Sequence, residues 1–217
     1  MTQQRVPEES VASNSATLLA WRSIVRPEAP PVDLLAAERA AAHLLLALGQ
    51  PMESDGMSET PRRMAQAYAE MLTAGSFEFT TFVNAEGYDE LVLVEDIPVR
   101  SLCEHHMLPF VGVAHVGYLP ADHILGLSKF ARLVDFYSHR SQTQERLTQQ
   151  IAEHLDDQLA PRGVGVVIEA EHSCMTLRGV QAVGARTVTS ALLGTLRTDP
   201  SSRAEFLALA RGRRQGC

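Results

Sequence analysis

The sequence predicts an α+β fold, with an antiparallel sheet that carries helices on one side. Two observations lead to this prediction. Five stretches of the 217-residue chain have apolar residues at helical spacing, and between them lie short runs of apolar and β-branched residues. A chain of this length can bury a sizeable core, and it contains no internal repeat.

The N-terminal part is expected to hold a tail followed by helices. Residues 1–30 are rich in Gln, Ser, Glu and Pro, so we expect a disordered tail there. Helical periodicity runs from Val32 to Gly49. A second helix is expected from Thr60, as the N-cap before Pro61, to about Ala74. Residues 31–90 are therefore predicted to be an N-terminal helical region.

Residues 91–212 are predicted to form the domain that contains the sheet. Four short apolar runs predict strands, and they cover residues 91–99, 111–119, 163–171 and 186–194. Three stretches of helical period predict helices, and they cover residues 128–139, 144–159 and 200–210. Asp199 before Pro200 is typical of the start of a helix, so we expect the last helix to begin there.

Composition excludes several classes of protein. A net charge of −7 argues against a nucleic-acid or membrane-surface partner. Only three cysteines occur and one is the last residue, so we expect no disulfide framework and a cytoplasmic location. The most apolar stretch, residues 44–48, is far shorter than the ~20 residues that a membrane span needs. The acidic Glu8 and Glu9 do not fit a secretion signal.

Two clusters of cysteine and histidine predict a zinc site. Cys103 and His106 are spaced so that one tight turn can direct both at a single ion, and thiolate and imidazole are ligands that zinc prefers. His172 and Cys174 follow an apolar run, 164–170. If the strand continues through them, they share a face and His172 stands beside the metal. Three protein ligands would leave a position for water, as at a catalytic zinc.

Two other interpretations of these clusters stay open at this point. A closed structural zinc would take His105 or His172 as its fourth ligand, although structural sites usually show two short ligand pairs and this chain has one. Alternatively, the two cysteines are small buried apolar residues and the histidines are surface groups.

The single lysine of the chain indicates a phosphate site. Eighteen of the 19 basic residues are arginine, and the exception is Lys129. If a helix begins at Ser128, Lys129 and Arg132 lie on one face beside free backbone N–H groups, which is a suitable arrangement for phosphate. The alternative is an ordinary solvated helix face.

Five segments together resemble the GTP cyclohydrolase I family in order and spacing. They are SLCEHHMLPF (101–110), GLSK (126–129), QERLTQQ (144–150), HSCMTLRG (172–179) and TVTSALLG (187–194). The resemblance extends from about Ala36 to Ala210. It implies a tunnelling fold: a curved antiparallel sheet backed by two long helices, after an N-terminal helical extension. It also implies a homo-oligomer, typically a decamer, with sites between subunits.

The same resemblance implies a zinc-dependent hydrolase that converts GTP and water into 7,8-dihydroneopterin triphosphate and formate. Its metal ligands would be Cys103, His106 and Cys174. Because C8 of GTP is a poor electrophile until N7 is protonated, His172 is the candidate acid. By the resemblance, His105 would assist the later ribose opening and rearrangement, with Ser128 nearby.

Substrate-binding residues follow from the same motifs. Glu145 would accept hydrogen bonds from N1–H and the 2-amino group of guanine and so reject adenine, with support from Gln144. The triphosphate would be held by four cations: Lys129, Arg132, Arg178 and Arg63. Gln66 stands where many relatives carry a basic residue, so triphosphate affinity could be lower.

Two further functions are alternatives to GTP hydrolysis. Another enzyme of the same fold, such as the nitrile reductase of queuosine synthesis or a pterin synthase, fits less well, because the reductase relies on a catalytic cysteine without this zinc triad. A non-catalytic, zinc-stabilised binding protein would have no use for His105, His172 and Glu145.

Overall fold

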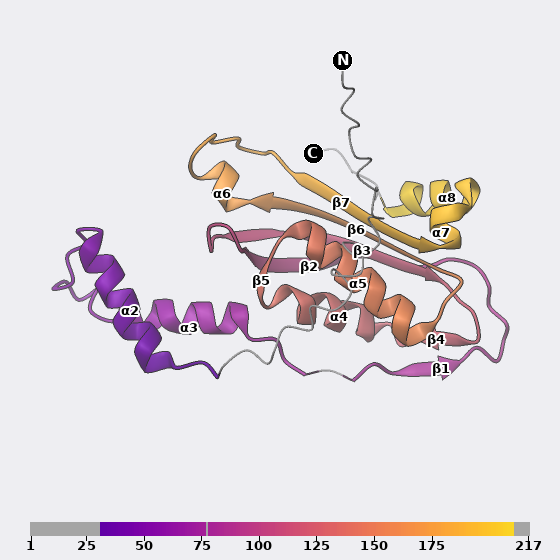
Figure 1. Ribbon diagram of the computed structural model, residues 1–217, viewed down its shortest axis with the longest axis horizontal. Coiled ribbons are helices and arrows are strands. Elements are labelled where there is room, and N and C mark those ends of the chain that lie inside the picture. Colours follow the sequence, from indigo (N-terminus) through magenta and orange to yellow (C-terminus); the bar gives the residue numbers. More distant parts are fainter. Residues whose placement is uncertain (1–30, 77, 211–217) are drawn as a thin grey trace, which may run out of the picture. The chain divides into compact units, whose positions relative to one another are not determined.

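The computed structural model describes residues 31–76 and 78–210, so the expected tail, residues 1–30, lies outside the described residues. The described residues from Leu34 to Ala210 form one compact unit built on a five-stranded sheet in the order β5-β2-β3-β6-β7 (Figure 1). Four strands pair antiparallel, as predicted: β2 (Val92–Cys103), β3 (Pro109–Leu119), β6 (Gly163–His172) and β7 (Thr187–Gly194).

Two differences from the predicted sheet lie close to the cysteine and histidine motif. The edge strand β5 (Ser141–Gln142) has only two residues and pairs parallel with the end of β2. A strand of that length has no periodicity that could predict it. In addition, β2 and β3 extend beyond the predicted runs up to the Cys-Glu-His-His turn, so this turn closes a regular hairpin.

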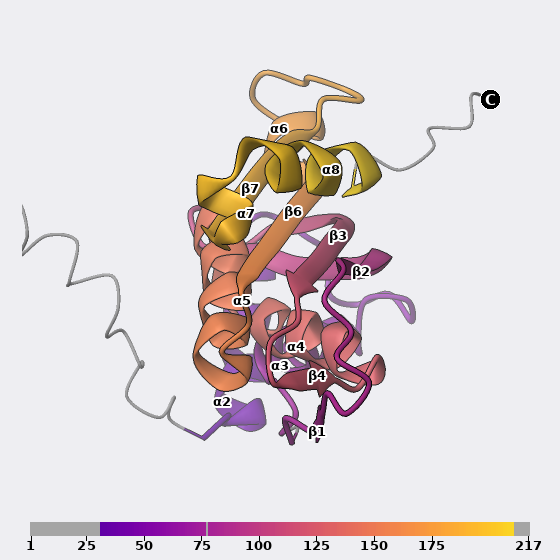
Figure 2. The same cartoon turned by 90° about the vertical axis from the view of Figure 1, so that its right-hand side faces the viewer.

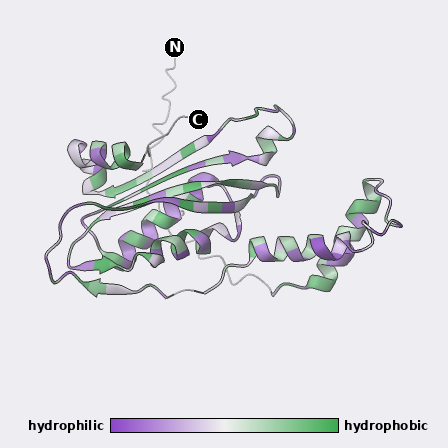
Figure 3. Ribbon diagram, turned by 180° about the vertical axis from the view of Figure 1, so that it is seen from behind, coloured by the Kyte–Doolittle hydropathy of each residue, from purple (hydrophilic) through white to green (hydrophobic). Residues whose placement is uncertain are grey.

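The two predicted long helices cover one face of the sheet. They are α4 (Ser128–Ser138) and α5 (Gln144–Leu159), and the bounds of α5 are those predicted. Leu147, Ile151 and Leu155 of α5 are fully buried against the sheet. Hydrophilic and hydrophobic residues alternate along both helices in Figure 3, as expected when only one side of a helix is buried. The helix α5 begins at an N-cap, Thr143, whose side chain accepts a hydrogen bond from the backbone N–H of Arg146.

The prediction that helices lie on one side only is wrong, because the C-terminal helices cover part of the other face. Here α7 (Thr195–Thr198) and α8 (Pro200–Ala210) lie across one end of the sheet (Figure 2). Phe206 of α8 is fully buried, and it fills the space above the paired glycines Gly117 and Gly165. The predicted start of this helix is confirmed, since the carboxylate of Asp199 accepts a hydrogen bond from the backbone N–H of Ser202.

The glycine beneath Phe206 makes this packing testable. A Cβ at Gly165 would lie 2.6 Å from Cζ of Phe206. We expect Gly165→Ala to lower the free energy of unfolding by about 1–3 kcal/mol, because the ring has to move within a packed cluster. Urea denaturation measures this. Gly75→Ala is the control, since a Cβ at Gly75 meets no atom within 4 Å; equal stability of both variants would contradict the packing described.

The N-terminal region is less purely helical than predicted. Its helices are α2 (Leu34–Ala47) and α3 (Thr60–Leu72), followed by β1 (Thr81–Val83), which pairs antiparallel with β4 (His123–Leu125). Glu59, not Thr60, is the N-cap of α3, and the Thr60 hydroxyl donates to the backbone oxygen of Gly56. The domain boundary near residue 90 stays a prediction.

Within the described ranges, every helix is too short or too polar to cross a bilayer.

Candidate metal centre and active site

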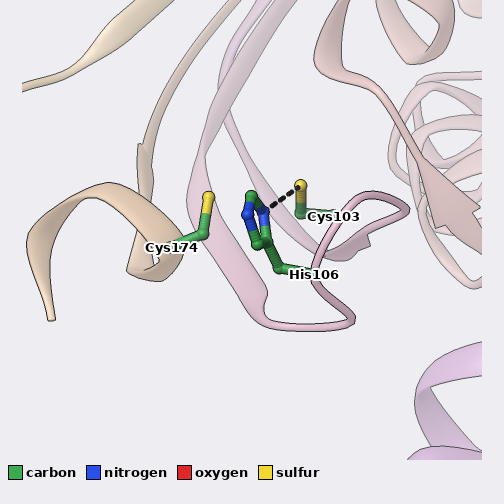
Figure 4. A group of neighbouring side chains, drawn as sticks. All are labelled: Cys103, His106 and Cys174. Carbon is green, nitrogen blue, oxygen red and sulfur yellow. Dashed lines mark hydrogen bonds between the residues drawn. The ribbon is translucent and has the colours of Figure 1, made fainter. Parts of the chain in front are cut away.

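Three side chains from two distant segments form a group that could hold a metal ion. The ligand atoms of Cys103, His106 and Cys174 all lie within 4.8 Å of one another. Cys103 ends β2, His106 lies in the turn between β2 and β3, and Cys174 lies in the short helix α6 (Ser173–Thr176). Figure 4 shows the three side chains gathered between this turn and α6.

The turn holds its two ligands close through main-chain hydrogen bonds. The backbone oxygen of Cys103 accepts from the N–H groups of His106 at 3.3 Å and Met107 at 2.8 Å. Met107 has a φ of 53°, which is the left-handed conformation that lets the chain reverse. The Tyr68 hydroxyl of α3 donates to the backbone oxygen of Met107 at 3.1 Å. As a result, Cys103 Sγ and His106 Nδ1 are 4.0 Å apart.

The expectation that β6 continues through Cys174 is wrong. The strand ends at His172, and the next four residues form the helical turn α6. Thus His172 and Cys174 are not neighbours on one face of a strand, and it is the helical turn that brings Cys174 to the metal group.

The chemistry of the three donors fits zinc. Burial raises the pKa of the Cys174 thiol and the facing Cys103 sulfur raises it further, while the Arg178 guanidinium acts in the opposite direction. These effects favour the protonated form of the Cys174 thiol, and a divalent cation bound by the two sulfurs would favour thiolates instead. Two thiolates and an imidazole are a donor set of zinc sites, with a further position left for water or substrate.

His172 is held firmly next to this group. It is the last residue of β6 and the register partner of Phe110, and the two rings stack with centroids 4.6 Å apart. Its Nε2 lies 2.8 Å from Oε1 of Gln144. Burial lowers the pKa of His172, and the nearby Glu145 carboxylate raises it. The imidazole therefore stands beside a negative charge in a site that is only partly open to water.

The other predicted catalytic and base-reading residues lie around the same end of the sheet. His105 is exposed in the turn, with Nδ1 3.8 Å from Cys103 Sγ. Glu145 is exposed in the first turn of α5, where the positive end of the helix favours a carboxylate. Gln144, expected to support Glu145, is instead buried beneath His172, so its amide faces the protein interior.

The four predicted phosphate-binding cations lie in three different segments, which are α3, α4 and the loop after α6. Arg178 follows α6, and its positive charge lowers the pKa of the Cys174 thiol, so this charge is close to the metal group. Lys129 and Arg132 share the start of α4 with the exposed Ser128. Arg63 of α3 donates through Nη2 to the backbone oxygen of Gly56 at 2.7 Å and to Thr60 Oγ1 at 3.0 Å.

A half-buried link between the turn and α5 was missed in the sequence. Arg146 pairs with Glu104 of the turn, and its Nε donates to Oε1 of Gln142 at 2.7 Å. The backbone N–H of Glu104 donates to the backbone oxygen of Gln142, which joins the turn to the edge strand as well. Glu104 and Arg146 lie within the motifs CEHH and QERLT. Their presence in these two motifs was the signal in the sequence that could have pointed to the ion pair.

We expect Arg146→Met to lower zinc affinity by about 10- to 100-fold, because the turn that carries Cys103 and His106 loses its link to α5. Competition with a chromogenic zinc chelator measures this affinity. Arg186→Met is the matched control, since it removes a more exposed ion pair with Glu169. If both variants bind zinc like the unaltered protein, the link has no part in holding the turn.

Comparison with known proteins agrees with the fold and the metal group. Residues 37–211 match the family model for GTP cyclohydrolase I. The GTP cyclohydrolase 1 of Streptomyces griseus subsp. griseus is 53% identical over 184 residues, which cover 82% of this chain and 90% of the relative. That of Thermobifida fusca is 50% identical over 188 residues, with 84% and 91% covered. That of Rhodopirellula baltica is 49% identical over 181 residues, with 82% and 79% covered. The chain therefore belongs to the GTP cyclohydrolase I family, and its sheet backed by α4 and α5 has the tunnelling fold.

Proposed function

We propose that this protein opens the imidazole ring of GTP by hydrolysis, releases C8 as formate and closes the product to 7,8-dihydroneopterin triphosphate. One observation carries the proposal: in a chain of this family, a Cys-His-Cys group lies beside a histidine and a carboxylate that could bind and protonate guanine. This arrangement fits hydrolysis of the base better than a purely structural metal, which would need neither group.

The metal would be held by Cys103, His106 and Cys174. Zinc bound there would act as a Lewis acid and make a water molecule nucleophilic at neutral pH. The remaining chemistry belongs to the side chains around it.

His172 would give a proton to N7 of the purine, which makes C8 electrophilic. Its position beside the metal group and beside Glu145 supports this role. His105, exposed in the same turn, would move protons during ribose opening and rearrangement, together with Ser128.

Glu145 would recognise guanine. Its carboxylate can accept hydrogen bonds from both N1–H and the 2-amino group, a pair of donors that adenine lacks. The position of Glu145 at the exposed start of α5, within electrostatic reach of His172, supports a base-reading role next to the proton donor.

The triphosphate would be bound by Arg178 together with Lys129, Arg132 and Arg63. By analogy with the family, we infer that subunits share their sites within a homo-oligomer, a decamer. We further infer a cytoplasmic enzyme that does not bind nucleic acid, in line with the net charge of −7.

The test is incubation of the purified, zinc-loaded protein with GTP, followed by assays for formate and for the fluorescence of the oxidised pterin. Formate with a neopterin signal supports the whole reaction. Formate alone would mean ring opening without rearrangement, against the roles given to His105 and Ser128. If protein with zinc bound yields neither formate nor a neopterin signal, the proposal is overturned.

A further inference from the structure

We propose that Gln144 is a positioning residue that holds the His172 ring in the tautomer with its proton on Nε2, so that Nδ1 is the nitrogen that serves the substrate. The inference rests on the proposed role of His172 as proton donor. It replaces the expectation, drawn from the sequence, that Gln144 supports Glu145 in reading the base.

The orientation of the Gln144 amide is fixed by what surrounds its nitrogen. Nε2 lies 3.0 Å from the backbone oxygen of Ile168 and 3.0 Å from that of Thr187. A carbonyl oxygen can only accept a hydrogen bond, so the NH2 group has to face these two atoms. The amide oxygen Oε1 therefore faces His172.

Two hydroxyl groups close the network in a single direction. Thr148 Oγ1 donates its only proton to the backbone oxygen of Gln144 at 2.7 Å. At the 2.6 Å contact between Thr148 Oγ1 and Thr189 Oγ1, Thr189 must then be the donor. Thr189 Oγ1 lies 3.1 Å from Nε2 of Gln144, so the two protons of this amide are shared among the hydroxyl and the two backbone oxygens. The amide cannot turn over without breaking several of these bonds.

It follows that the His172 ring carries its proton on Nε2. The Oε1 atom of Gln144 can only accept, so at 2.8 Å the His172 Nε2 has to be the donor. Gln144 and Thr148 are each only 1% exposed, so water does not compete for these bonds. Stacking on Phe110 fixes the plane of the ring. Among residues 31–76 and 78–210, no side chain or backbone group bonds to Nδ1.

This arrangement defines the proton transfer. In the step to substrate, the N–H bond at Nδ1 breaks and the N–H bond at N7 of the purine forms. The ring passes from imidazolium to neutral imidazole and keeps the proton that Gln144 holds on Nε2. A ring in the other tautomer would present an N–H bond at Nδ1 even when neutral, and it would have to lose its hydrogen bond to Gln144.

The test compares Gln144→Met with the unaltered protein in the formate assay. Methionine has a similar length but cannot accept the proton of Nε2. We expect kcat to fall about 100-fold or more, in the range of general acid catalysis, while KM changes less than about threefold. Zinc content should stay the same. The matched control is Gln149→Met, because Gln149 is exposed on the same helix and its side-chain amide donates to the carboxylate of Glu153.

The double variant Gln144→Met/His172→Ala decides whether Gln144 acts through His172. We expect it to be no slower than His172→Ala alone. Additive losses would overturn the inference, and so would a rise in KM at unchanged kcat, which would mean that Gln144 binds the base. An unaltered protein that releases no formate would refute the proposed function instead.

If Gln144→Met does not fold, unaltered protein labelled with ¹⁵N-histidine provides the second measurement. In the ¹⁵N NMR spectrum, the signals of His172 are those that are missing from the His172→Gln variant. We expect these signals to show a protonated Nε2 and an unprotonated Nδ1 in the neutral ring. The opposite pattern would overturn the inference.

Discussion

Cys174→Ser is expected to lose zinc and turnover together. Cys174 supplies one of three donor atoms that lie within 4.8 Å of one another, and a serine hydroxyl is a poor zinc ligand at neutral pH. If each ligand contributes about a third of the roughly 10–16 kcal/mol of a protein zinc site, affinity should fall by about 10²–10⁴-fold. Metal analysis after dialysis and the formate assay measure the two losses.

The control for this change is Cys217→Ser. The motifs shared with the family end near Ala210, so this variant should keep both zinc and activity. Full activity of a Cys174→Ser protein that contains no zinc would refute the proposed mechanism.

Glu145→Ala is expected to keep zinc and lose GTP binding. The side chain is exposed, and it is not among the three grouped donors. Two hydrogen bonds from guanine to a carboxylate are worth on the order of 3–6 kcal/mol, so Kd for GTP should rise by roughly 10²–10⁴-fold. Titration of GTP into the protein, with zinc content measured on the same sample, tests this prediction.

A second substrate sharpens the test of Glu145. Inosine triphosphate lacks the 2-amino group, so the unaltered protein should prefer GTP, while Glu145→Ala should bind both nucleotides about equally weakly. Glu153→Ala, on the same helix, should leave the preference intact. If Glu145→Ala still prefers GTP, another group reads the base.

Long, strongly periodic segments were predicted well from sequence. The helix α5 has the predicted bounds because Leu147, Ile151, Leu155 and Leu159 form one apolar stripe and Thr143 caps its start. The short elements β5, α6 and α7 were missed because two to four residues hold no repeat. The missed helix α6 has the largest consequence for the site. Cys174 reaches the metal group because it lies in this helical turn and not in β6.

The sequence by itself determined which chemical groups are available for the site. The spacing of Cys103 and His106 predicts a shared ion, since a tight turn is a local structure set by neighbouring residues. The sequence also determined the family, through motifs spread over residues 101–194.

Only the tertiary structure decided what each side chain contacts. Gln144 bonds to Ile168 and Thr187, which are 24 and 43 positions away, and these contacts set its orientation toward His172. Phe206 likewise packs over Gly117 and Gly165, on the face of the sheet that was predicted to carry no helix. Periodicity reports which side of an element is buried, whereas hydrogen-bond partners depend on how distant elements pack, and local sequence carries no record of that packing.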